Sequence, residues 1–151
     1  MREIEKKRAA LLVATLAGTF VVLRVYLHLW PSTNLNVGRY NVHHLFTGLL
    51  LIALGGIPLA VSRGPRRLLD VATAVFGVGL AMALDEWVYL IVTDGTDASY
   101  VLPVSFWGGV SMVVLACVYV LALVLGGRGG ATGWRLKLGS RLGDSLRDGK
   151  P

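Results

Sequence analysis

Six of the ionisable side chains that lie inside or at the ends of long apolar stretches could act together. They are Arg24, His28, His43, His44, Asp85 and Glu86. An ionisable group placed within a membrane costs roughly 2.5–3.5 kcal/mol on insertion scales, so each of the six requires a physical reason. Imidazole and carboxylate groups are common metal ligands, and carboxylates are also the usual partners of arginine in buried ion pairs.

A bound divalent transition metal is one chemistry that this set predicts, with zinc, iron or manganese as the ion. The candidate ligands are three imidazoles and two carboxylates, namely His28, His43, His44, Asp85 and Glu86. Neighbouring residues on a helix point about 100° apart. His43 and His44 therefore share one ion only if the first turn of their helix is irregular, and the same constraint applies to the two carboxylates.

A structural ion-pair network is the competing interpretation. Arg24 and Glu86 each lie six residues from the outer end of an apolar run, which places both ~9 Å below the membrane boundary. Arg24 is therefore expected to face Asp85 and Glu86. Because one arginine neutralises one of the two carboxylates, a proton, a protonated histidine or a cation must balance the other.

Neighbouring side chains are weaker candidates for membership of the same polar cluster. Tyr89 lies one turn from the carboxylates and is a candidate donor to one of them, and Ser105 is expected to close the remaining wall. Tyr100 and the other outer aromatics suit the interfacial belt, which is their ordinary role. Asp94 and Asp97 are expected to form turns.

Four apolar runs must position these side chains. They cover residues 9–30, 42–61, 68–92 and 101–125. A helix of about 20 residues crosses a hydrocarbon core of roughly 30 Å. The connections are short, so we expect consecutive helices to be antiparallel neighbours. The sequence therefore predicts an all-α integral membrane four-helix bundle, up-down-up-down, within residues 1–126.

The basic residues predict the orientation of this bundle. Of the 15 Lys and Arg residues, all except Arg24 and Arg39 lie before the first run, between the second and third, or after the fourth. The positive-inside rule then places both termini in the cytoplasm of a multi-pass protein of the cell membrane. The same distribution explains the net charge of +6 without nucleic acid as a partner. The single cysteine, Cys117, excludes an intrachain disulfide.

The tail, residues 127–151, begins with a glycine-rich break and then becomes amphipathic. Its apolar residues recur every four positions, at Trp134, Leu138, Leu142 and Leu146. Basic side chains lie between them, a pattern typical of a short helix on the cytoplasmic membrane surface. A partly disordered solubilising tail is the alternative.

Two motifs, NVHHLFTGLL (41–50) and GVGLAMALDEWVYL (77–90), resemble a widespread group of uncharacterised prokaryotic small integral membrane proteins. In that group a His-His motif opens one helix, and a Leu-Asp-Glu-aromatic motif in the next helix precedes an acidic, aromatic-containing outer loop. The matching residues are His43, His44, Leu84, Asp85, Glu86 and Trp87, with Asp97 and Tyr100 in the loop. The resemblance covers roughly residues 41–110. It implies no established activity and indicates that the His-His and Asp-Glu pairs belong together.

Three classes of function remain open, and the sequence does not decide whether the chain is an enzyme. The first is a binding or structural membrane protein, as a subunit of a larger membrane complex or a homo-oligomer. The second is a metal-dependent membrane enzyme acting on a lipid or quinone-like substrate at the outer leaflet, with Asp85 or Glu86 as general base. The third is a small transporter or channel, which the absence of ionisable groups in the inner halves of 42–61 and 101–125 disfavours. The first class is the prediction.

Overall fold

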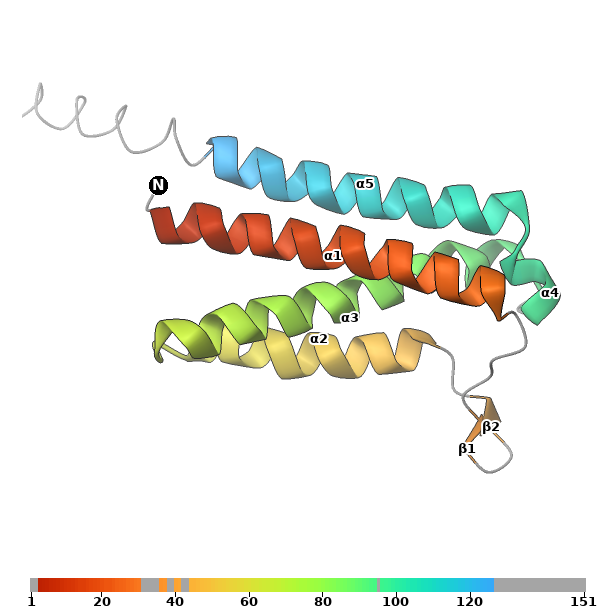
Figure 1. Ribbon diagram of the computed structural model, residues 1–151, viewed down its shortest axis with the longest axis horizontal. Coiled ribbons are helices and arrows are strands. Elements are labelled where there is room, and N and C mark those ends of the chain that lie inside the picture. The colour runs from red at the N-terminus through yellow and green to blue at the C-terminus, as the bar shows by residue number, and fades with distance from the viewer. Residues whose placement is uncertain (1–2, 31–35, 38–39, 42–43, 95, 127–151) are drawn as a thin grey trace, which may run out of the picture.

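The computed structural model describes residues 3–30, 36–37, 40–41, 44–94 and 96–126. Within them lie four long helices, α1 (Glu3–Leu29), α2 (His44–Val61), α3 (Arg66–Val92) and α5 (Pro103–Gly126). The short elements are the helix α4 (Asp97–Tyr100) and two antiparallel two-residue strands, β1 (Asn36–Val37) and β2 (Tyr40–Asn41). Figure 1 shows α4 and the strands at one end of the molecule and the N-terminus at the other. The predicted tail helix lies outside the described residues and stays a prediction.

All four long helices are long and apolar enough to cross a membrane. The 27 residues of α1 extend ~40 Å, because an α-helix rises ~1.5 Å per residue. That length exceeds the hydrocarbon core, and the charged residues of the first two turns of α1 account for the excess. The chain is a multi-pass membrane protein, as the four apolar runs predict, and the surplus at the start of α1 is the charged segment of the N-terminus.

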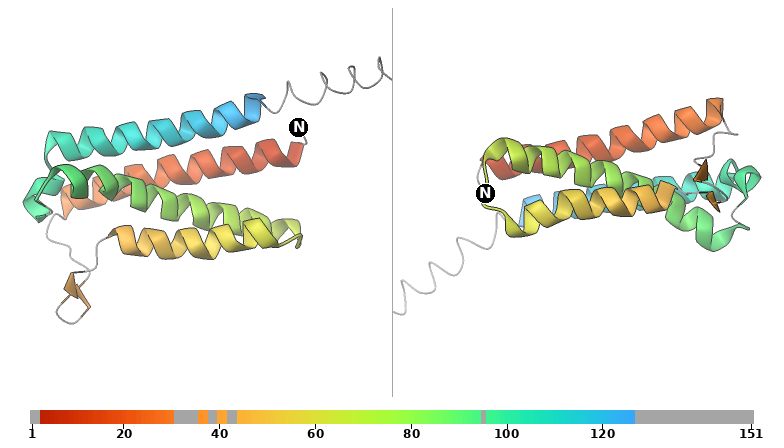
Figure 2. Two further views of the ribbon diagram at one scale, coloured as in Figure 1. Left: turned by 180° about the vertical axis from the view of Figure 1, so that it is seen from behind. Right: turned by 90° about the horizontal axis from the view of Figure 1, so that it is seen from below.

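Helix α3 is the centre of the arrangement. It packs against α2 on one side and against α1 and α5 on the other, and these layers can be followed in Figures 1 and 2. Consecutive helices are therefore not all neighbours, because the described parts of α1 and α2 are at most in marginal contact. Residues 30–43, which include the two strands, are a connection long enough to carry the chain from α1 to the far side of α3.

Glycines allow α2 and α3 to approach closely. A Cβ atom built on Gly48 would lie 2.7 Å from the carbonyl oxygen of Gly79, and one on Gly55 would lie 2.5 Å from the backbone nitrogen of Phe76. These distances leave no room for a side chain, so the backbones are nearly in contact. Small residues serve this purpose in membranes, where close packing replaces the hydrophobic effect as the force between helices.

The apolar core lies between α1, α3 and α5. Its buried members are Leu16, Phe20, Ala81 and Val113. Most of the other large apolar side chains are exposed, including Leu50 and Leu54 on α2 and Leu115 on α5. In water such a surface would promote association, but in a bilayer it faces hydrocarbon.

Substitution of Gly55 by alanine tests the close contact between α2 and α3. The added methyl group would overlap backbone atoms of α3, and overpacking of this kind costs about 1–3 kcal/mol. We expect Gly55→Ala to lower the unfolding temperature of the detergent-purified protein. Gly18→Ala is the matched control, because no atom lies within 4 Å of a Cβ built there, and alanine is the better helix former. Equal effects of the two substitutions would contradict the contact.

Candidate functional site

The first part of the candidate site is an ion pair between α1 and α3. Nε and Nη2 of Arg24 lie 2.7 Å and 2.6 Å from Oδ1 of Asp85. The other carboxylate oxygen, Oδ2, accepts a hydrogen bond from the hydroxyl group of Tyr100. The side chains of Arg24 and Asp85 are 10% and 2% exposed, so the pair is shielded from its surroundings. The sequence predicts that Arg24 faces both Asp85 and Glu86, and the ion pair that the structure describes is the one with Asp85.

The guanidinium group of Arg24 also contacts the start of α5 and the end of α4. Its Nη1 donates to the carbonyl oxygen of Tyr100 at 3.3 Å, and its Nη2 donates to the carbonyl oxygen of Ser105 at 3.0 Å. The Tyr100 ring centroid lies 4.4 Å from Cζ of Arg24, within the range of a cation–π interaction. One side chain thus connects α1 with α3, α4 and α5.

Glu86, the neighbour of Asp85, binds the beginning of α2. Its Oε1 accepts the backbone N–H of His44 at 3.1 Å and lies 3.0 Å from Nδ1 of the same residue, while Oε2 accepts the backbone N–H of Leu45 at 2.5 Å. A carboxylate at a helix N-terminus satisfies N–H groups that have no partner within the helix and suits the positive end of the helix dipole. Helix α2 begins at His44, and Glu86 of α3 binds its first N–H groups.

The two carboxylates therefore have different partners. Asp85 faces Arg24 and Tyr100, whereas the described contacts of Glu86 are with His44 and Leu45. Adjacent helix positions point about 100° apart, so this division follows from helical geometry. The charge of Glu86 is balanced at least in part by the N-terminus of α2.

The candidate metal ligands are only partly brought together. His44 contacts Glu86, and His28 lies near the end of α1, whereas His43 lies outside the described residues. Among the residues that the structure describes, no group of three or more His, Cys, Asp or Glu side chains could hold a metal ion. The metal site stays a prediction, and its test must include His43.

Tyr100 has a larger part in the site than its sequence context indicates. Burial, and after it the negative charge of Asp85, raise the pKa of the Tyr100 phenol, whose hydroxyl donates to Asp85. One feature of the sequence points to this role of Tyr100: it lies in the acidic, aromatic-containing loop after the Leu-Asp-Glu-aromatic motif. Tyr89 takes a different partner from the one expected, because its hydroxyl donates to the carbonyl oxygen of Thr96 at 3.0 Å.

The loop before α4 holds Tyr100 in position. The carboxylate of Asp94 accepts hydrogen bonds from the hydroxyl of Ser99 and from the backbone N–H and hydroxyl of Thr96. These bonds, that of Ser99 first, lower the pKa of the Asp94 carboxyl. Asp94 is thus a turn-forming residue, as expected.

Helix α5 completes the wall beside the ion pair with two small residues. Ser105 is fully buried, and its hydroxyl oxygen has no hydrogen-bond partner among the described residues. A Cβ built on Gly109 would lie 2.8 Å from Oδ1 of Asp85 and 3.0 Å from Nη2 of Arg24. A larger residue at position 109 would therefore displace the ion pair.

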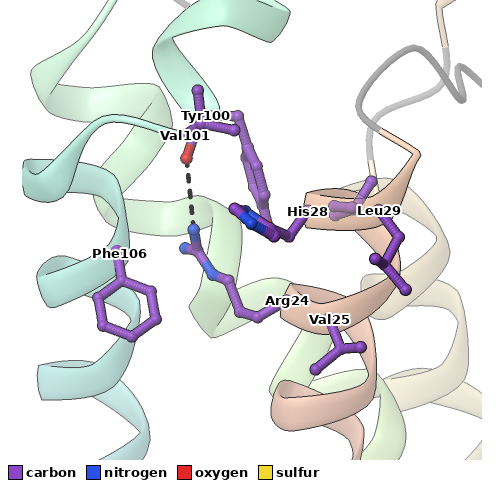
Figure 3. A pocket seen from close by; sticks show the side chains of 8 residues that line it. Arg24, Val25, His28, Leu29, Tyr100, Val101 and Phe106 are labelled. Carbon is purple, nitrogen blue, oxygen red and sulfur yellow. Dashed lines mark hydrogen bonds between the residues drawn. The ribbon is translucent and has the colours of Figure 1, made fainter.

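A pocket with a volume of about 350 Å³ lies beside Arg24, between the end of α1 and the start of α5 (Figure 3). It is lined by Arg24, Val25, Leu27, His28, Leu29, Tyr100, Val101 and Phe106. Small-molecule sites in proteins have volumes of about 300–1,000 Å³ and are mostly apolar with a few polar groups. The sequence does not predict this pocket, because its lining comes from helices whose relative rotation the sequence leaves open.

Substitution of Arg24 by leucine measures how much the Arg24–Asp85 ion pair contributes to the stability of the fold. Loss of one partner leaves the Asp85 carboxylate buried without its charge partner, which costs about 3–5 kcal/mol. We expect this decrease in the free energy of unfolding for Arg24→Leu in mixed detergent–dodecyl sulfate micelles. Arg8→Leu is the control, because the Arg8–Asp70 pair has a similar Nε–Oδ1 distance of 3.1 Å but side chains 28% and 39% exposed. Such a pair contributes about 0–1 kcal/mol. Equal losses would contradict a buried, stabilising Arg24–Asp85 pair.

Comparisons with known proteins identify no relative. The chain matches no protein-family model, no curated protein and no solved structure. The function must therefore be inferred from the geometry of the site.

Proposed function

We propose that the chain is a small polytopic membrane protein of binding and structural type. In this proposal the polar cluster is an ion-pair network in the outer half of the membrane that fixes the helices around the pocket beside Arg24. The observation that supports it is the occupation of both carboxylates: Asp85 accepts hydrogen bonds from α1 and α4, and Glu86 accepts them from α2. Each carboxylate thereby joins α3 to another helix.

The proposal includes an orientation. The four helices cross the cell membrane up-down-up-down, with both termini in the cytoplasm. Arg63 in the turn at 62–65 and Arg66 and Arg67 at the start of α3 lie at the same end of the molecule as the N-terminus. Helix α4 and the two strands lie at the other end (Figures 1 and 2). Positive residues retained on the cytoplasmic side support this assignment.

The outer surface of α2 supports a packing role. Helix α2 has its main contact with α3, and its remaining faces expose Phe46, Leu50 and Leu54. In the proposal this surface is covered by lipid, and in a homo-oligomer or a larger membrane complex it is the surface available to another subunit.

A metal-dependent enzyme acting on a lipid or quinone-like substrate at the outer leaflet is the alternative. One contact favours it: Nδ1 of His44 lies 3.0 Å from Oε1 of Glu86, which places an imidazole and a carboxylate side by side. Zinc, iron or manganese would use these groups, with His43 as a further ligand.

Sensitivity to chelator distinguishes the two functions. If the cluster is an ion-pair network, EDTA leaves the unfolding temperature of the purified protein unchanged, and His43→Ala changes it little. A metal site instead stabilises the folded protein by its binding free energy, so removal of the ion lowers the unfolding temperature. Stoichiometric zinc, iron or manganese in the wild type, with an EDTA effect that His43→Ala or Glu86→Gln abolishes, would favour the enzyme.

Labelling of single cysteines tests the orientation. On a Cys117→Ser background, we expect a membrane-impermeant maleimide to label Ser32→Cys in intact cells. Ser62→Cys and Ser140→Cys should react after permeabilisation, because the proposal places both in the cytoplasm. Labelling of Ser62→Cys in intact cells would contradict this orientation.

A further inference from the structure

The pocket beside Arg24 has two polar groups that the ion-pair network does not use fully. Figure 3 shows the guanidinium of Arg24 and the imidazole of His28 facing the same space, next to the ring of Tyr100. Arg24 forms the inner wall of the pocket, and His28 lies one helical turn nearer the end of α1. The space between them is where a ligand would meet both groups.

Both groups have hydrogen-bond donors available. A guanidinium group has five N–H bonds, and the contacts with Asp85, Tyr100 and Ser105 use one on Nε, two on Nη2 and one on Nη1. The second N–H of Nη1 has no partner in the described part of the chain. The imidazole of His28 has no hydrogen-bond partner there either, and a neutral imidazole carries one N–H.

The net charge of the site determines whether a charged or a neutral hydrogen-bond acceptor of a ligand would bind in the pocket. Arg24 and Asp85 together are neutral, so the pocket presents N–H donors without an excess positive charge. An anionic group bound here would add an uncompensated charge within the membrane, which is costly. A neutral oxygen acceptor, such as a carbonyl group, satisfies the donors without that cost.

The apolar walls select the rest of the ligand. Val25, Leu29 and Phe106 line the pocket and are 54%, 59% and 40% exposed. In a transmembrane helix such exposure is to the bilayer, so the pocket is continuous with the hydrocarbon around the protein. A ligand with an apolar body enters from the membrane and keeps that body among these side chains.

We propose that this pocket binds the carbonyl oxygen of a neutral amphiphile, with Nη1 of Arg24 and the imidazole of His28 as donors. Two sources share this chemistry, the acyl ester of a membrane lipid and the ring of a quinone. The proposal rests on the proposed function, because the Arg24–Asp85 pair holds the inner wall of the pocket in place.

Binding to protein in dodecyl maltoside micelles, whose detergent has no carbonyl group, tests the proposal with three probes. Decylubiquinone carries quinone carbonyls, 1,2-dioctanoylglycerol carries acyl esters, and decanoate carries an anionic head on a similar chain. We expect saturable binding of decylubiquinone or dioctanoylglycerol, accompanied by a rise in unfolding temperature, and at least about tenfold weaker binding of decanoate, because a tenfold ratio needs only ~1.4 kcal/mol. The carbonyl probe that binds identifies the source, and binding of both supports recognition of the carbonyl alone.

Three variants locate the binding site. Val25→Trp fills the pocket and should abolish saturable binding, whereas Val22→Trp, at a more exposed position of α1 outside the lining, should retain it. His28→Leu removes one donor and should weaken binding about fivefold to tenfold without lowering the unfolding temperature of the ligand-free protein. Binding of neither carbonyl probe, tighter binding of decanoate, or equal effects of the two tryptophans would overturn the proposal.

Failure of this proposal is distinguishable from failure of the proposed function. If Arg24→Leu unfolds as easily as the wild type, the ion-pair network is contradicted, whatever the wild-type protein binds. If Arg24→Leu is strongly destabilised but neither carbonyl probe binds to the wild type, the network stands and the ligand assignment is wrong.

Discussion

The burial of two adjacent carboxylates in one apolar helix is the constraint on which the rest of the structure depends. Asp85 and Glu86 are each 2% exposed, and removal of a carboxylate from water costs several kcal/mol unless donors replace the solvent. Because adjacent positions point about 100° apart, one partner cannot easily serve both. Helix α3 must therefore have donors on two sides, Arg24 of α1 on one and the N-terminus of α2 on the other. Its central position among the helices follows from this requirement.

The need for hydrogen-bond donors to the buried carboxylates also determines the conformation of the outer connection between α3 and α5. Oδ2 of Asp85 is bound by Tyr100, so the loop must turn back toward α3 after α3 ends. The hydrogen bonds that Asp94 accepts from Thr96 and Ser99 fix that turn, and α4 then presents Tyr100 to the carboxylate. Gly109 leaves the space in which Asp85 and Arg24 meet. The conformation of the loop before α4 and the glycine at position 109 of α5 are thus both explained by the buried charge of Asp85.

The sequence predicts some of these features because they depend on one helix at a time. Bilayer thickness sets the length of the four spans, and the rise per residue places Arg24 at the depth of Glu86 and close to that of Asp85. Contacts that depend on the rotation of one helix against another were not predictable in this way. Glu86 binds the first N–H groups of α2, Tyr100 binds Asp85, and α1 lies apart from α2, yet none of these is encoded by spacing within a run. A buried phenol and a belt aromatic also look alike in the sequence, so the sequence predicts a belt position for Tyr100.

The ion pair and the pocket are physically coupled through the rigidity of Arg24. A free arginine side chain has ~2 kcal/mol of rotamer entropy and would readily occupy a neighbouring cavity. Here its contacts with Asp85, Tyr100 and Ser105 fix the guanidinium, and Tyr100 covers one face. The entropy is therefore lost when the protein folds and not when a ligand binds, which is how preorganisation increases affinity. The interaction that stabilises the helices is thus also the one that holds a donor ready at the wall of the pocket.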